Sequence, residues 1–208
     1  MKRLLIAFAL SAAISACNNN PDGTRAKVSE AADSSAVATG NSLKVSTQDS
    51  KLEWHGKKVT GAHHGIVNIS DGTIYVNGGK LSGGSFKMDM TSITNNDLQD
   101  KEYKNKLETH LKSAEFFDVA KYPDANLEIT NVKDLGNHKA EISANLTIKS
   151  VTKNILFTAD IAEATDTTFK GSADFNINRQ DWGVAYKGMQ DDLISDEVNF
   201  KINLVAAK

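Results

Sequence analysis

The segment FKGSADFNIN, residues 169–178, alternates apolar and polar side chains with a period of two. Such alternation indicates a β-strand that has one dry face and one wet face. The pattern recurs at residues 141–149, 155–161 and 198–204. We therefore predict antiparallel strands whose apolar faces enclose one interior. We assign ten side chains to this interior, nine from these strands and Phe86 from the first half of the chain. They are Phe86, Ile142, Ala144, Leu146, Phe157, Ala173, Phe175, Ile177, Phe200 and Ile202.

Turn residues separate the predicted strands. The pairs Asp71-Gly72 and Asn77-Gly78 place glycine after a short polar residue, which is typical of two-residue hairpins. Gly136-Asn137 predicts a further hairpin. The strands of the first half are shorter and less regular, and we place them at about residues 43–47, 51–58, 64–70, 73–77 and 80–91.

One helix is predicted between the strands, over about residues 98–112. Asn95, Asn96 and Asp97 precede it, and side chains of these types cap helix N-termini. Lys112 lies at the C-terminal end, where the helix dipole favours a cation. The apolar stripe that we expect on this helix consists of Tyr103, Leu107, His110 and Leu111.

A long antiparallel sheet has to protect its edges, and closure into a barrel removes them. The predicted fold class is therefore all-β: an antiparallel β-barrel of about eight strands with one short helix. A barrel of this size either fills with side chains or holds one ligand. Small inward residues such as Gly171 and Ala173 leave room, but an ordinary core also mixes large and small residues. Periodicity alone leaves both outcomes open.

Three separated motifs make the chain resemble a known family. They are HLKSAEFFDVAKYP at residues 110–123, LTIKSVTK at 146–153 and NRQDWG at 178–183. In this order they resemble the YceI-like family of bacterial periplasmic proteins, whose lipocalin-like β-barrels hold a long isoprenoid lipid. The resemblance extends over about residues 42–207, and we assign residues 42–208 to one YceI-like barrel domain.

The resemblance implies non-enzymatic binding, storage or transport of a polyisoprenoid amphiphile, either quinone-like or an isoprenoid phosphate. The tail would occupy the barrel and the head group would lie at its mouth, with no covalent cofactor and no metal. Arg179 either contacts an anionic head group or forms an internal bridge to Asp181 or to the backbone. The candidates for the head-group site or the barrel end are His110, Lys112, Ser113, Phe116, Phe117, Arg179, Asp181 and Trp182.

The start of the chain has the features of a bacterial lipoprotein signal. Residues 1–16 combine a basic start with an apolar run too short to span a membrane, and Cys17 follows Ile-Ser-Ala. This resembles a lipobox, which implies cleavage before Cys17 and lipidation of its sulfur. Residues 17–41 contain few large apolar side chains, so we predict a disordered tether after the lipidated cysteine. The expected location is the cell envelope, anchored by lipid and facing the periplasm, and Asn18 favours the outer membrane.

Charge and cysteine content restrict the partners. Loss of Lys2 and Arg3 with the signal peptide leaves 22 of the 24 basic side chains against 26 acidic ones, a net charge of −4. No basic stripe accompanies this balance, so we expect no nucleic-acid partner. Cys17 is the only cysteine, which excludes an intramolecular disulfide. The expected partners are the isoprenoid lipid or quinone and the membrane, and an oligomer is possible.

Two alternative functions follow from other residues. His55, His63 and His64 are candidates for a metal-dependent or acid–base enzyme, although adjacent strand residues point to opposite faces, so only one of His63 and His64 can enter a site. No His-Glu-x-x-His helix accompanies them. The second alternative is an envelope stress or interaction module that uses the barrel only as a scaffold, because a fold does not fix a function.

Overall fold

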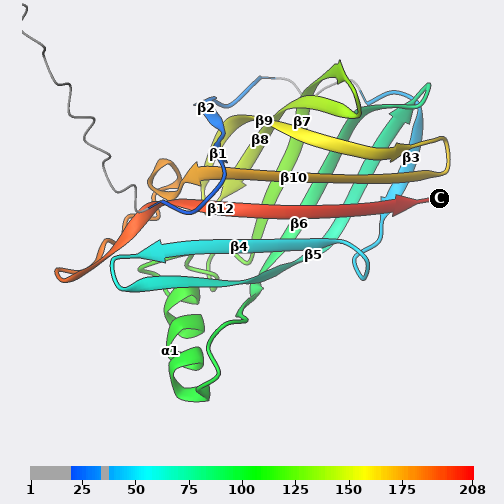
Figure 1. The fold of residues 1–208 in the computed structure, drawn as a ribbon. Helices are drawn as coiled ribbons and strands as arrows, with labels where there is room; N and C mark the ends of the chain where they lie inside the picture. Colours follow the sequence, from blue (N-terminus) through cyan, green and yellow to red (C-terminus); the bar gives the residue numbers. More distant parts are fainter. Residues whose placement is uncertain (1–19, 34–37) are drawn as a thin grey trace, which may run out of the picture.

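The computed structural model describes residues 20–33 and 38–208, which form a closed antiparallel β-barrel with one α-helix (Figure 1). This confirms the predicted fold class. The predicted signal peptide and lipidated Cys17 lie outside the described residues. In the part of the chain that the structure describes, no helix has the length and apolar character needed to cross a membrane.

Eight strand positions make the ring. β3 and β4 share one position between β5 and β12, and antiparallel pairing between β9 and β10 closes the barrel. The elements of the ring are β3 (Asn41–Val45), β4 (Lys51–Lys58), β5 (Gly61–Asn77), β6 (Lys80–Asn95), β7 (Asp124–Gly136), β8 (Lys139–Ile148), β9 (Val151–Ala164), β10 (Thr168–Asn178) and β12 (Asp192–Ala207).

The two ends of the barrel differ. At one end, here called the near end, lie the β4–β5 hairpin, helix α1 (Lys101–Lys112), the 3-10 helix η1 (Arg179–Trp182) and the short strand β11 (Gly188–Met189), which pairs with the start of β12. The far end carries the β5–β6 and β7–β8 hairpins, which a Lys80–Asp134 ion pair of 2.8 Å joins. Within residues 20–33 and 38–208, helices extend beyond the sheet only at the near end.

The turn predictions were right except at Asp71-Gly72. Hairpins form at the other two sites, with Gly78-Gly79 and Asn137-His138 as the turn residues, whereas Asp71-Gly72 lies inside β5 beside a β-bulge. A Cβ on Gly72 would lie 2.9 Å from Val45 Cγ2, so glycine is required there for close packing and not for a turn. The two strands predicted at 64–70 and 73–77 are consequently one strand.

Helix α1 begins three residues after its predicted start. Asp100 is the N-cap, and its carboxylate accepts hydrogen bonds from the Glu102 and Tyr103 backbone N–H groups. Asn95 is occupied elsewhere, since it accepts from the Leu98 N–H and donates to the His64 carbonyl. The prediction of Tyr103 in the apolar stripe was wrong, because this side chain is 62% exposed.

The first described residues contradict the predicted disordered tether. β1 (Thr24–Arg25) pairs parallel to β10, and β2 (Lys27–Glu30) pairs antiparallel to β9. β9 and β10 pair with each other only at residues Phe169–Ala173 of β10. Beyond that stretch each strand has a free edge, and β1 pairs with the edge of β10 while β2 pairs with the edge of β9. Backbone pairing, which composition does not reveal, orders this segment. We call residues 20–32 the strap.

Polar side chains of the barrel hold the strap along its length. Asn176 donates to the Pro21 carbonyl at 3.0 Å, and Asn145 exchanges two hydrogen bonds of 2.9 Å with the Ala32 backbone. Ala26 is buried and donates its N–H to the Asn176 carbonyl. The strap is therefore an integral part of the barrel wall.

Candidate functional site

A cavity of about 380 Å³ lies inside the barrel. Its lining includes Leu81 and Phe169 at the far end and His63 and Met189 at the near end, so the cavity runs along the barrel. Leu81 and Phe169 are buried, whereas Met189 is 71% exposed. The cavity is therefore closed at the far end and reaches the surface at the near end. Its size lies in the range of roughly 300–1,000 Å³ that is usual for small-molecule sites.

The predicted interior residues line this cavity with one exception. Ala144 is fully buried but does not reach the cavity, because it lies between the longer side chains of Ile129 and Ile155 on the neighbouring strands. The members that line the cavity are Phe86, Ile142, Leu146, Phe157, Ala173, Phe175, Ile177, Phe200 and Ile202.

The cavity wall is aliphatic and aromatic. Phe157 stacks on Phe175 with ring centroids 4.4 Å apart, and Phe175 lies 6.1 Å from Phe200. Strands of the first half supply much of the remaining wall, which the sequence analysis missed apart from Phe86. Bulges in the β5–β6 pairing interrupt the alternation there, so periodicity gives no clear signal. The missed residues include Leu52, Trp54, Val67, Ile69, Ile74, Met88, Met90 and Ile93.

Aromatic side chains from three segments cover the near end. His110 of α1 lies 5.7 Å from Phe116 and 4.5 Å from Tyr186, measured between ring centroids. Phe116 is buried and packs edge-on against Phe117. His110, Phe116, Phe117 and Tyr186 all line the cavity. The loop after α1 thus places a partial aromatic plug over the cavity.

Four of the residues predicted for the head-group site or the barrel end do not line the cavity. Ser113 donates its hydroxyl to the His110 carbonyl at the end of α1, and Trp182 is fully buried and donates its indole N–H to the Leu146 carbonyl at 2.9 Å. The other two are Lys112 and Asp181.

Arg179 lines the cavity but its guanidinium is occupied by the protein. It is buried and donates to the carbonyls of Ser195, at 3.0 Å, and of Val184, and it lies 3.4 Å from the Asp196 carboxylate. Burial lowers the pKa of Arg179, and the Asp196 charge opposes that effect. Of the alternatives left open for Arg179, the structure shows the bridge to the backbone, and the acidic partner is Asp196 and not Asp181 because the β12 strand passes beside the guanidinium.

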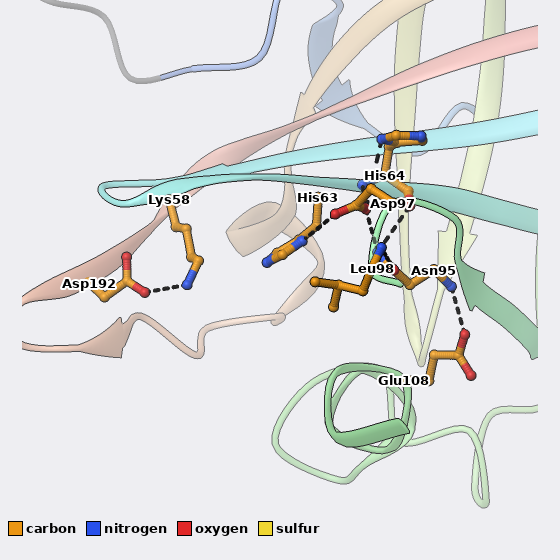
Figure 2. A network of polar contacts seen from close by, with 8 residues as sticks. All are labelled: Lys58, His63, His64, Asn95, Asp97, Leu98, Glu108 and Asp192. Carbon is orange, nitrogen blue, oxygen red and sulfur yellow. Dashed lines mark hydrogen bonds and ion pairs between the residues drawn. The ribbon is translucent and has the colours of Figure 1, made fainter. Parts of the chain in front are cut away.

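A histidine–aspartate hydrogen bond and a lysine–aspartate ion pair lie at the near end (Figure 2). His63 Nδ1 lies 2.8 Å from an Asp97 carboxylate oxygen, and Lys58 is hydrogen-bonded to Asp192. The side chains of His63 and Lys58 point to the same side of the β4–β5 hairpin. Burial raises the pKa of Asp97, but hydrogen bonds from the His64 N–H, His63 and Asn95 outweigh it, so the pKa is lowered overall. Lys58 was not predicted as a cavity residue, because the sequence around it does not indicate which face of the strand its side chain occupies.

The histidines do not form one cluster. His63 faces the cavity, whereas His64 lies on the opposite face and stacks on His55 with ring centroids 5.5 Å apart. The expectation that the adjacent histidines separate is confirmed. Within residues 20–33 and 38–208, no three His, Cys, Asp or Glu side chains converge as a metal site requires.

Comparisons with known sequences give one family. A family model described as the YceI-like domain matches residues 43–206. A UPF0312 protein of Pseudomonas savastanoi pv. phaseolicola is 28% identical over 148 residues, which cover 66% of this chain and 72% of that protein. A UPF0312 protein of Pseudomonas putida is 38% identical over 84 residues, or 38% of this chain and 44% of that protein.

Solved structures share the barrel. BcnA of Burkholderia cenocepacia matches with a TM-score of 0.65 and 22% identity, over 78% of this chain and 99% of BcnA. A polyisoprenoid binding domain from Saccharophagus degradans, implicated in plant cell wall breakdown, matches with a TM-score of 0.60 and 13% identity, over 79% and 97% of the two chains. At such identities the likeness shows the fold alone.

Proposed function

Because this chain belongs to the YceI-like family, we propose that its barrel binds a polyisoprenoid amphiphile and catalyses no reaction on it. The observation that carries this proposal is the apolar cavity of about 380 Å³, which is closed at the far end and reaches the surface at the near end. An amphiphile fits such a space in one direction only, with its tail inside and its head group at the near end.

The driving force for tail binding is burial of hydrocarbon. Transfer of each CH₂ group from water into an apolar site contributes about 0.8 kcal/mol, so a tail of several prenyl units gains more than its ordering costs. The wall offers aliphatic groups and the rings of Phe157, Phe175 and Phe200, and the charged side chains among the described lining residues lie at the near end. The polyisoprenoid binding domain of the same fold supports this ligand class.

The head group would meet polar side chains at the near end. Lys58 and His63 line the cavity there, each beside a carboxylate, and both can donate hydrogen bonds to oxygen. A quinone carbonyl or an isoprenoid phosphate can accept such bonds. Arg179 stabilises the near end through its hydrogen bonds to the Ser195 and Val184 carbonyls.

The cellular setting is proposed from the sequence. The signal-like residues 1–16 and Cys17 support a lipid-anchored protein of the cell envelope that faces the periplasm. In that setting the barrel stores the lipid or carries it between membrane surfaces.

Mass spectrometry of an organic extract tests the proposal. The full chain is purified from bacterial membranes under gentle conditions, and we expect a prenyl-chain lipid in roughly one copy per protein. Ala173→Phe, which fills the cavity, should reduce lipid content at least about tenfold. Thr158→Phe on the outer face of β9 is the matched control and should retain the lipid.

Two outcomes would overturn the proposal. One is an extract without lipid together with no uptake of an added prenyl quinone or prenyl phosphate. The other is equal lipid content in the Ala173→Phe and Thr158→Phe proteins, which would place the lipid outside the cavity.

A further inference from the structure

Exposed apolar side chains gather at the near end. In the described part of the chain, Val59, Met189 and Leu193 are 60%, 71% and 48% exposed. The Val59 N–H donates to the Leu193 carbonyl at 3.1 Å, and Leu193 pairs with Gly188 next to Met189. Met189 pairs with Asp192, so its side chain points to the same face of the β11–β12 hairpin as Asp192, and Leu193 points to the other face. These three residues, here called the rim, therefore place apolar side chains on both faces of the hairpin tips that border the cavity.

The rim is continuous with the cavity. Met189 lines the cavity and is the one lining residue classed as exposed among those the structure describes. Lys58 and Asp192, which also line it, flank Val59 and Leu193 along the chain. A lipid that leaves the cavity at this end passes directly over the rim.

The start of the described chain lies beside the rim. Asn20 accepts a hydrogen bond of 2.8 Å from the Ser195 hydroxyl, and Asp22 lies 3.7 Å from Lys57. Nineteen residues precede Asn20, and Cys17 is three residues away, a step of at most about 11 Å in extended chain. A membrane anchor at that cysteine would hold the near end against the bilayer.

The charges around the rim are mixed. Lys57, Lys58 and Lys187 lie there with the acidic residues Asp22, Asp191, Asp192 and Asp196. Lys57 lies 3.7 Å from Asp22, and Lys58 is hydrogen-bonded to Asp192. This surface has no positive excess to attract anionic head groups. Contact with a membrane would therefore depend on the apolar side chains.

We propose that the rim is a membrane-contacting surface, on which Val59, Met189 and Leu193 enter the interface of a lipid bilayer and hold the cavity mouth over the acyl chains. The inference rests on the proposed function, and it adds the route of the ligand: the lipid moves between bilayer and cavity without crossing water. Side chains of this size lose contact with water on entering the interface, which favours the bound orientation.

Residue-specific depth measurements test the contact. Leu193→Cys and Leu135→Cys are labelled with an environment-sensitive fluorophore in a Cys17→Ser background and mixed with phosphatidylcholine vesicles. Leu135 is the matched control, since it is 45% exposed at the far end. We expect a blue shift and quenching by vesicle-embedded nitroxide lipids at position 193 only, with little effect of salt.

Lipid transfer separates this inference from the proposed function. Leu193→Ser and Val59→Thr should slow removal of a fluorescent prenyl lipid from vesicles about tenfold in combination, while uptake from detergent micelles stays unchanged. Leu135→Ser should change neither rate. Normal micelle uptake with equal vesicle rates for the rim and Leu135 variants overturns the membrane contact alone. Absence of uptake from micelles by the unmodified protein overturns the proposed function.

Discussion

Arg179 shows how one buried side chain organises the near end of the barrel. Its guanidinium joins the carbonyls of Val184 and Ser195 and approaches the ring of Phe116 at 5.8 Å. It thereby connects η1, β12 and the loop after α1. The partner carboxylate of Asp196 is half exposed, so solvent screens that part of the interaction. The main role of Arg179 is to satisfy buried backbone carbonyls.

Replacement of this side chain tests that role. Arg179→Met should lower the free energy of unfolding by about 3 kcal/mol, because two buried carbonyls lose their donors. Asp196→Asn should cost at most about 1 kcal/mol. Denaturant unfolding measures both. If Arg179→Met leaves stability unchanged and abolishes lipid binding, Arg179 is a head-group ligand instead.

Asp97 gives the near end a defined pH dependence. Hydrogen bonds from the His64 N–H, His63 and Asn95 outweigh desolvation and hold the pKa of Asp97 below its ordinary value of 3.8. The unfolded chain therefore binds more protons between the two pKa values, and stability rises with pH there. The contribution of Asp97 is complete above its ordinary pKa and is lost as pH falls through the lowered one.

Asp97→Asn should therefore lower the free energy of unfolding by about 1 kcal/mol at pH 7. The difference from the unmodified protein should shrink as the pH falls below 3.8. Urea unfolding at pH 7 and at pH 3 measures this difference. A gap that persists unchanged at pH 3 would show that the carboxylate charge does not stabilise the site.

Among the elements, the strands that could be predicted from the sequence are those in which the alternation of apolar and polar residues matches the alternation of buried and exposed faces. The C-terminal strands alternate regularly because each has one face in the interior, so every residue that we assigned to the cavity on these strands lines it except Ala144. β5 and β6 contain bulges that shift the alternation, and Asp71-Gly72 serves close packing within a strand. The strap has few large apolar residues and is ordered by pairing with β9 and β10, which no local pattern indicates.

Substitution of Gly23 tests whether the strap stabilises the barrel. This residue has φ of +137°, and a Cβ there would lie 2.3 Å from Asn176 Oδ1. Gly23→Ala should therefore lower the free energy of unfolding by about 1–3 kcal/mol and speed hydrogen exchange of the amides that β9 and β10 share with the strap.

Gly61→Ala is the matched control for this substitution. A Cβ at Gly61 would meet open space, and the residue has no positive φ. Its stability and exchange rates should stay near those of the unmodified protein. Equal behaviour of the two variants would mean that the strap does not stabilise the barrel wall.

At the scale of the whole molecule, the barrel combines a closed far end, an apolar interior and a polar, aromatic near end. Leu81 and Phe169 seal one end, while Met189 marks the opening at the other. This polarity matches an amphiphile in one orientation. The strand pattern predicted the interior, but the free space within it depends on how side chains from different strands pack together, which no local pattern indicates.

Photo-cross-linking with a prenyl lipid that carries a diazirine at the tip of its tail tests this arrangement most directly. The account predicts that tandem mass spectrometry finds the label on far-end cavity residues such as Leu81, Phe169 or Leu204, and that an unlabelled prenyl lipid displaces it. Label on outward-facing residues, or label that no competitor displaces, would contradict the account.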